Sequence, residues 1–331
     1  TLFGSPADAR VSPPPPRPPL DNPRAACEFE DVVSEKYERL CGLLRSYGSC
    51  LVAYSGGVDS FFLAYVAHAM LGEKSLAVIA DTPSLPRREL DQALALARQY
   101  QLPLRVIQTR EFQNPNYLAN PNNRCFFCKH DLFTELVPLA RAEGLACIAY
   151  GENASDLGDY RPGAQAAAQF QARAPLKEAG LTKADIRALS ARLGLPTADK
   201  PQMACLSSRI PYGEAVTPEK LRMIEQAEDF LRDLGFYDVR VRHHELRKSA
   251  LLATSLHLAR IEVGAGEMPK LLENGGSAKV AAALKKFGYA HVTLDLQGYR
   301  RGSANEVLPL ADAADAASRP PPAPPSPSSG P

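Results

Sequence analysis

The sequence contains no tryptophan, only four methionines and almost no excess of either charge. Its 38 Lys and Arg residues against 37 Asp and Glu residues give a formal net charge of +1, which argues against nucleic acid as the main partner. No run of about 18 apolar residues occurs, and no apolar signal-peptide core lies near the start, so no membrane span and no secretory signal is predicted. We therefore expect a cytoplasmic protein, with an organelle transit segment at the arginine-containing start as the alternative.

Proline and serine dominate both ends of the chain. The segments "SPPPPRPPLDNP" and "SRPPPAPPSPSSGP" have a composition that cannot bury a core. We expect disordered tails at residues 1–28 and 304–331, with the folded region between them.

The seven cysteines are an odd number in a chain without a secretory signal, so a disulfide framework is not expected. Metal or reactive chemistry is favoured instead. Cys125 and Cys128 lie together in "NRCFFCKHD", and Cys205 stands in "QMACLSSRIPYG". The others occur in tail, helical or apolar contexts that are typical of small packing residues: Cys27, Cys41, Cys50 and Cys147.

Residues 29–205 alternate between short apolar runs and helical patterns of about a dozen residues. The runs are "CLVAY", "SLAVIADT", "LPLRVIQT" and "LACIAYGEN", and a helix is expected from Phe133 in "FTELVPLARAEG". This order predicts an α/β domain, a parallel sheet with helices on both faces. Ligands bind beyond the carboxyl ends of such strands, where "YSGGVDS", "DTPS" and "GENASD" lie.

Residues 206–303 follow the order helix, strand, strand, helix, strand, which predicts a small α+β domain for substrate binding or oligomerisation. In "FYDVRVR" the period of two places Arg240 and Arg242 on the face opposite Val239 and Val241. A solvated strand surface is the alternative interpretation of that pattern.

The stretch "YSGGVDS" has the glycines of a phosphate-binding turn but not the lysine of a Walker A loop. Gly56 and Gly57 allow a sharp turn, and the following helix directs unpaired N–H groups at an anion. Ser55 and Ser60 add hydroxyl donors. Asp59 would repel a bare phosphate, so we expect it to hold Mg²⁺ or to fix the loop.

Ser-Gly-Gly-x-Asp-Ser after a first strand resembles the PP-loop pyrophosphatases, which cleave ATP between the α- and β-phosphates. The segments "GENASD", "YRPG" and "APLKEAGLTKADIRALSARLGLPTADKPQMACLSSRIPYGE", with "IEQAE" and "VRVR", resemble the LarE family of sulfur transferases over most of residues 30–300. The resemblance implies an adenine nucleotide alpha hydrolase-like fold with ATP and Mg²⁺ as cofactors. It also implies adenylation of the carboxylates of pyridinium-3,5-biscarboxylic acid mononucleotide and their conversion to thiocarboxylates, in nickel-pincer nucleotide cofactor biosynthesis.

The resemblance places Cys205 at the sulfur-donor position, and we expect Asp59, through its role in the glycine turn, to be the second catalytic residue. One branch of the family uses a single cysteine sacrificially, and a second has three cysteines that hold a [4Fe-4S] cluster. This sequence resembles the three-cysteine branch, with Cys125, Cys128 and Cys205 as ligands. Zinc bound with His130 as a fourth ligand, and a sacrificial Cys205 without metal, are the alternatives. A redox dithiol normally opens a helix in a thioredoxin-like unit, which the sequence does not indicate.

The resemblance also implies an anion pocket for the substrate, built from Ser208, Arg209, Arg240 and Arg242, since the arginine fork pairs with phosphate or carboxylate. Glu228 is predicted as a metal ligand or subunit contact, with a solvated helix face as the alternative. The expected partner is a small-molecule nucleotide substrate, and the expected assembly is a homo-oligomer. Two other functions stay open: another PP-loop ligase or tRNA thiolase, and a metal-binding nucleotide sensor without turnover.

Overall fold

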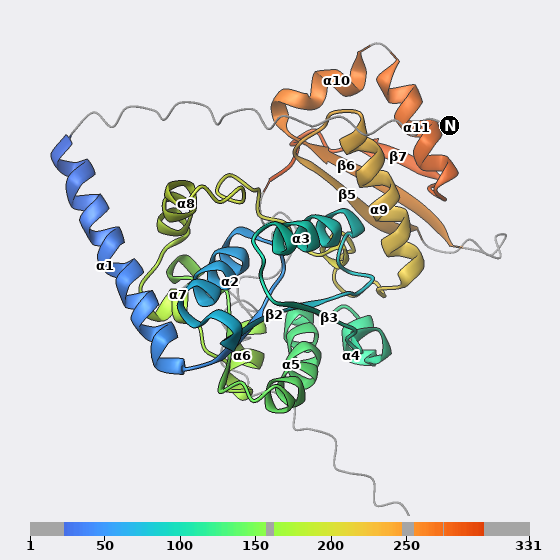
Figure 1. Ribbon diagram of the computed structural model, residues 1–331. Coiled ribbons are helices and arrows are strands. Elements are labelled where there is room, and N and C mark those ends of the chain that lie inside the picture. The colour runs from blue at the N-terminus through green and yellow to red at the C-terminus, as the bar shows by residue number, and fades with distance from the viewer. Residues whose placement is uncertain (1–22, 157–161, 247–254, 274, 301–331) are drawn as a thin grey trace, which may run out of the picture.

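The computed structural model describes residues 23–156, 162–246, 255–273 and 275–300, and these residues contain two separate sheets (Figure 1). The predicted tail at 304–331 and most of the one at 1–28 lie outside the described residues. The first described helix, α1, spans Pro23–Tyr47, so it begins six residues before the expected start at residue 29.

The first sheet is fully parallel, as the alternating pattern predicts, and its strand order is β3-β2-β1-β4. Its strands are β1 (Cys50–Ala53), β2 (Ser75–Ala80), β3 (Leu104–Ile107) and β4 (Cys147–Tyr150). The chain moves outward from β1 to β3 and then returns to the other side of β1. Such a reversal opens a crevice at the carboxyl ends of the two strands beside it.

Helices cover both faces of this sheet, which confirms the predicted α/β architecture. One face packs against helices that share a core built around Phe61, Phe62 and Leu63: α1, α2 (Val58–Leu71), α3 (Arg87–Gln99) and α8 (Lys183–Arg192). The other face packs against α5 (Arg124–Ala142) and α6 (Pro162–Gln169) through Phe133 and Leu136. The short helices α4 (Pro115–Leu118) and α7 (Pro175–Glu178) lie between the longer elements.

Helix α5 begins at Arg124, nine residues before the expected start at Phe133. Phe126 and Phe133 are seven residues apart and both buried, so the apolar face of the helix continues through the cysteine motif. The cysteine motif therefore forms the first turns of α5, ahead of the predicted start of the helix.

The second sheet has the order β5-β6-β7, with an antiparallel first pair and a parallel second pair. Its strands are β5 (Val239–Leu246), β6 (Leu256–Val263) and β7 (His291–Leu294). Its core joins residues of the strands to α9 (Pro218–Asp233), α10 (Met268–Leu272) and α11 (Gly276–Lys286). This arrangement is the α+β unit that the order of elements predicts.

The alternation in β5 is confirmed, but the solvated alternative is wrong. Val239 and Val241 lie in the core of the second unit, and Arg240 and Arg242 point to the opposite face. That face is covered too, because the two arginines are only 6% and 8% exposed. No helix in the described part of the chain is long and apolar enough to cross a lipid bilayer.

Gly56 is held in a left-handed conformation, with φ of +68°, where α3 crosses the glycine turn. A Cβ atom at this position would lie 2.5 Å from the Cβ of Ala93. We expect Gly56→Ala to lower the free energy of unfolding by about 2–4 kcal/mol in urea denaturation, because both the strain and the collision are penalised. The control is Gly42→Ala in α1, where a Cβ meets nothing within 4 Å and should stabilise the helix. Equal stability of Gly56→Ala and the wild type would contradict this packing.

Candidate functional site

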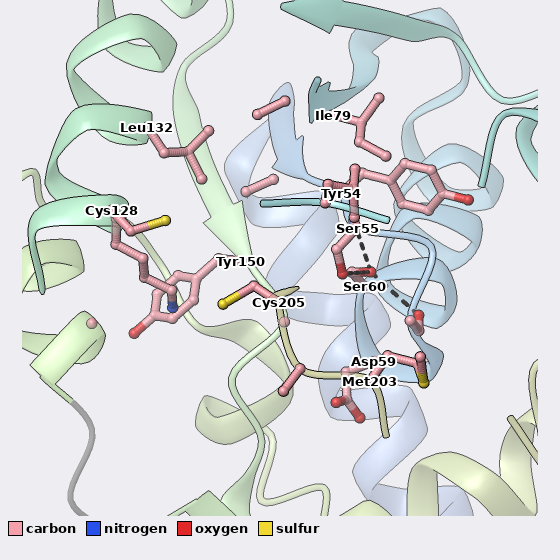
Figure 2. A pocket seen from close by; sticks show the side chains of 18 of the residues that line it. Tyr54, Ser55, Asp59, Ser60, Ile79, Cys128, Leu132, Tyr150, Met203 and Cys205 are labelled. Carbon is pink, nitrogen blue, oxygen red and sulfur yellow. Dashed lines mark hydrogen bonds between the residues drawn. The ribbon is translucent and has the colours of Figure 1, made fainter. Parts of the chain in front are cut away.

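A pocket of about 580 Å³ lies at the carboxyl ends of the parallel strands (Figure 2). The glycine turn lines one part of it through Ser55, Gly57, Asp59 and Ser60, and the three predicted metal-binding cysteines line another. The fold thus brings the glycine turn together with Cys125 and Cys128, about 70 residues further along the chain, and with Cys205, about 150 residues further along. This is the edge of the sheet at which the sequence predicts the ligand.

The glycine turn is closed by its own serines. The hydroxyl of Ser60 lies 3.0 Å from that of Ser55 and accepts a hydrogen bond from the Ser55 backbone N–H at 3.1 Å. Gly57 is the N-cap of α2 and offers no side chain to cap the first turn, so the helix N-terminus keeps unpaired N–H groups. A Cβ at Gly151, directly after β4, would lie 3.1 Å from the backbone nitrogen of Ser60. The strand end and the helix start are therefore in close contact.

The two carboxylate oxygens of Asp59 differ in their partners. Its Oδ2 pairs with Lys183, while its Oδ1 is buried without a hydrogen-bond partner. Burial raises the pKa of Asp59, and Lys183 partly offsets that rise. A buried carboxylate oxygen left unpaired is costly, and carboxylate oxygen is the ligand type that Mg²⁺ prefers. The residue therefore fits a magnesium ligand at the edge of the turn.

Two lysines supply the positive charge that the glycine turn itself lacks, and neither was predicted from the sequence. Lys183 pairs with Asp59 from a position 124 residues further along, and Lys200 donates to the backbone oxygen of Gly56 at 3.2 Å. Lys200 also pairs with Glu89 at 2.7 Å. One local feature of the sequence could have indicated a role for Lys183. It is the first residue of α8, where a cation faces the positive end of the helix dipole and needs a compensating partner.

The three cysteines face a common space. Cys125 and Cys128 come from the start of α5, and Cys205 precedes the 3₁₀ turn η4 (Leu206–Arg209). In Figure 2 the sulfur atoms of Cys128 and Cys205 point into the same part of the pocket. Burial raises the pKa of the Cys128 thiol well above its usual range, and the charges of Cys205 and Glu111 raise it further.

A buried arginine, Arg124, lies near these thiols. Arg124 is 4% exposed and donates to the backbone oxygen of Ser207 at 3.0 Å. Within the described part of the chain, no carboxylate makes an ion pair with it. A guanidinium without a carboxylate partner can balance the negative charge of nearby thiolates. The set of three thiols with this cation fits the chemistry of an iron–sulfur ligand shell.

A single metal ion fits less well. Among the described residues, no group of three or more His, Cys, Asp or Glu side chains could hold one. His130, the fourth ligand of the zinc alternative, instead packs edge-on against Phe170 with ring centroids 5.1 Å apart. A cluster differs from one ion because each cysteine binds a different iron atom, so its three ligands need not converge on one point.

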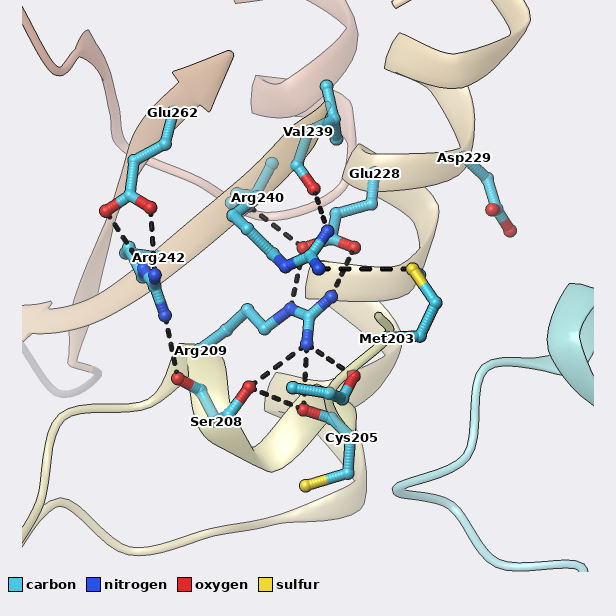
Figure 3. A network of polar contacts seen from close by, with 12 residues as sticks. Met203, Cys205, Ser208, Arg209, Glu228, Asp229, Val239, Arg240, Arg242 and Glu262 are labelled. Atoms are coloured by element: carbon cyan, nitrogen blue, oxygen red, sulfur yellow. Dashed lines mark hydrogen bonds and ion pairs between the residues drawn. The ribbon is translucent and has the colours of Figure 1, made fainter. Parts of the chain in front are cut away.

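Arg209 and Glu228 form an ion pair in which both side chains are 0% exposed (Figure 3). Arg209 Nε donates to Glu228 Oε1 at 2.8 Å, and its Nη2 donates to Oε2 at 3.0 Å. The remaining nitrogen of Arg209 donates to the backbone oxygens of Ala204 and Cys205. In this arrangement Arg209 offers no surface to a substrate; it holds the turn that carries Cys205.

Glu228 is saturated by further donors. Arg232 pairs with it at 2.7 Å, and the backbone N–H of Val241 donates to it at 3.0 Å. The structure therefore corrects three sequence-based interpretations. Arg209 is not placed to bind substrate, Glu228 has no free oxygen for a metal ion or a second subunit, and its helix face is not solvated.

The other three predicted anion ligands, Ser208, Arg240 and Arg242, differ in which partners their polar groups already have. Arg242 pairs with Glu262 through two 2.9 Å contacts and donates to the backbone oxygen of Ser208. The Ser208 hydroxyl donates to the Cys205 backbone oxygen at 2.7 Å. Arg240 has no carboxylate in ion-pair contact within the described residues. Its Nη2 lies 3.4 Å from the backbone oxygen of Gln202, a residue that lines the pocket. Its Nη1 donates to the Val239 backbone oxygen at 2.6 Å, its guanidinium lies over the Tyr299 ring, and Arg240 itself does not line the pocket.

Comparison with known proteins decides the family. No family model matches the chain. The uncharacterized protein slr1717 of Synechocystis is 42% identical over 277 residues, which cover 84% of this chain and 99% of that protein. The pyridinium-3,5-bisthiocarboxylic acid mononucleotide synthase of Lactiplantibacillus plantarum is 31% identical over 284 residues, 86% of this chain and 98% of that enzyme. The chain belongs to the LarE family.

The wider superfamily is supported by a more distant relative. A glutamine-hydrolyzing GMP synthase of Phenylobacterium zucineum is 27% identical over 230 residues, which cover 58% of this chain and 41% of that enzyme. These comparisons confirm the resemblance and, with the parallel sheet, the PP-loop α/β fold of this LarE-family chain.

The buried ion pair generates a test of stability against pH. Burial alone would raise the pKa of Glu228, but Arg209 and the neighbouring arginines lower it to about 2. We expect Glu228→Gln to lower the free energy of unfolding by about 3–5 kcal/mol at neutral pH, because Arg209 is left buried without its counter-charge.

The sign of the pH effect follows from that lowered pKa. The stabilisation is complete above the unfolded-state pKa of about 4.3 and is lost as the pH falls toward 2. The stability difference between the wild type and Glu228→Gln should therefore shrink across that window. The control is Glu219→Gln on the same helix, where the side chain is 70% exposed and the change should stay below about 1 kcal/mol. A difference that does not vary with pH would contradict the assignment.

Proposed function

We propose that the protein is an ATP-dependent sulfur transferase that converts the carboxylates of pyridinium-3,5-biscarboxylic acid mononucleotide to thiocarboxylates, in nickel-pincer nucleotide cofactor biosynthesis. The observation that carries the proposal is the shared pocket, which joins a nucleotide-binding turn to three cysteines. The family relationship supports the same chemistry, since one relative is named as the synthase of the bisthiocarboxylic product.

The first step is adenylation. A carboxylate oxygen of the substrate attacks the α-phosphorus of ATP, the bond from that phosphorus to the bridging oxygen breaks, and pyrophosphate leaves. The N–H groups at the start of α2 and the hydroxyls of Ser55 and Ser60 bind the departing pyrophosphate. Lys183 and Lys200 add positive charge at the same place. Mg²⁺ would bind the free oxygen of Asp59 and neutralise charge on the leaving group.

The second step needs a sulfur nucleophile at the acyl carbon, from which AMP leaves. A [4Fe-4S] cluster, for which Cys125, Cys128 and Cys205 are the fitting ligands, would supply a bound sulfide as the donor. In the sacrificial alternative the Cys205 thiolate attacks and AMP departs. Loss of the Cys205 α-proton then breaks its Cβ–S bond, which leaves the thiocarboxylate and dehydroalanine. In both routes Arg209 fixes the backbone at Cys205, and Arg240 is the proposed ligand of the substrate phosphate.

Asp59→Ala tests the adenylation step. We expect pyrophosphate release with ATP and the pyridinium mononucleotide to fall about 10²–10³-fold, because the group that places charge beside the leaving phosphates is lost. Asp91→Ala, at an exposed position of α3, is the matched control and should be unaffected. Full activity of Asp59→Ala would refute its role. Absence of pyrophosphate release by the wild type would refute the enzyme and favour the sensor without turnover.

Cys128→Ser tests the cluster. After anaerobic reconstitution we expect the wild type to hold about four iron and four sulfide ions per chain, as a [4Fe-4S] cluster requires. The variant should lose both, together with multiple turnover, while pyrophosphate release continues. Cys147→Ser removes a partly buried thiol that does not line the pocket, and should keep the iron. Zinc at one ion per chain without iron would refute the cluster assignment.

A further inference from the structure

Glu111 is a buried carboxylate in the pocket that neither step of the proposed reaction uses. It begins the 3₁₀ turn η2 (Glu111–Gln113), which follows β3, and it is 1% exposed. Its Oε2 accepts a hydrogen bond from the hydroxyl of Thr109, while its Oε1 is buried without a hydrogen-bond partner. Such an atom carries an uncompensated desolvation cost, which a bound ligand can remove.

Cations do occur around Glu111, since Arg124 lies near the thiols and Lys129 lines the same pocket. Within the described residues, no lysine, arginine or histidine makes an ion pair with Glu111. It lies near Cys128, and apolar and aromatic side chains line the same pocket: Val78, Ile79, Leu132, Phe133 and Tyr150. By contrast, Lys183 and Lys200 stand at the glycine turn, where they pair with Asp59 and Glu89. The pocket therefore has a phosphate-binding part with two lysines, and a part in which the Glu111 carboxylate makes no ion pair with a described residue.

The chemistry of these walls discriminates between possible cations. A divalent metal ion needs several oxygen, nitrogen or sulfur ligands, and the described residues present no group of three that could hold one. An aromatic ring that carries a delocalised positive charge needs only one counter-charge, with apolar walls for its faces. Glu111 offers the counter-charge, and Leu132 and Phe133 offer apolar walls. The Tyr150 ring is not counted among them, because Lys129 Nζ lies 4.3 Å from its centroid.

We propose that Glu111 is the specificity-determining residue that selects a positively charged aromatic ring over a neutral one, by placing its unpaired carboxylate oxygen against the ring. The inference rests on the proposed function, from which the pyridinium ring of the substrate is taken. It goes beyond that function because it assigns recognition of the ring charge to a residue of this chain outside the glycine turn and the cysteines.

The test compares two ligands that differ in ring charge. Nicotinate mononucleotide has a cationic ring, and its 1,4-dihydro form has a neutral ring with the same substituents. Binding to the full chain is measured by titration calorimetry without ATP. We expect the wild type to prefer the cationic ring at least tenfold and Glu111→Gln to bind both forms equally. Glu135→Gln, which removes a carboxylate on α5 that does not line the pocket, should keep the preference.

Thermal unfolding of the ligand-free variants separates recognition from a structural role. Because Gln removes a buried charge that has no partner, Glu111→Gln should unfold at the same temperature as the wild type or higher. A fall of several degrees with the ring preference retained would make Glu111 a structural residue and overturn the proposal.

Three binding results would also overturn it: equal binding of both rings by the wild type, binding of neither ring, or a preference that persists in Glu111→Gln. None of these outcomes depends on ATP cleavage or sulfur transfer. Failure of this inference is therefore distinguishable from failure of the proposed function, which the pyrophosphate assay decides.

Discussion

The ion pair between Arg209 and Glu228 is the contact on which the site depends. Two fully buried charges must satisfy each other, because neither has access to water, and a mismatch of position would leave both uncompensated. The pair joins α9 of the second unit to the turn that carries Cys205, and the same guanidinium fixes two backbone oxygens of that turn. The second unit thereby sets the position of the sulfur that the first unit needs.

The same buried network decides which arginines have a carboxylate partner. Arg209 and Arg242 each have a carboxylate of their own, Glu228 and Glu262, and each also donates to a backbone oxygen at Cys205 or Ser208. Arg240 lies between them, is buried, and has no such partner among the described residues. Burial and the charge of Arg209 lower its pKa, which is the expected response of a cation that lacks a counter-charge. Its guanidinium donates to the backbone oxygens of Val239 and Gln202 and lies over the Tyr299 ring, so these groups hold it without a carboxylate from the described residues.

Local patterns predicted the first sheet well, because the periodicity of strands and helices and the glycine turn each depend on residues that are neighbours in the sequence. The carboxyl-end location of the site followed from topology alone. What the sequence could not give is contact across long separations. Lys183 and Lys200 reach the turn from more than 120 residues away. The alternation of β5 showed which residues face away from its core, but not that the turn at Cys205 covers that face. The start of α5 was placed nine residues too late, although Phe126 and Phe133 lie on one apolar face that continues through the cysteine motif.

The distribution of charge in the pocket favours one orientation of a bound nucleotide. At the glycine turn, two lysines and a helix N-terminus favour phosphate, and the one unsatisfied acidic oxygen there, on Asp59, suits a metal ion bound to phosphate. At the thiols, Arg124 and Lys129 are present, but the Glu111 carboxylate makes no ion pair with a described residue, and the walls are largely apolar. A nucleotide placed in the opposite direction would bring its phosphates against an unpaired carboxylate, a contact that costs free energy in a buried site. Under the proposed function, these groups would place the phosphates of the nucleotide at the glycine turn and its carboxylate at the cysteines.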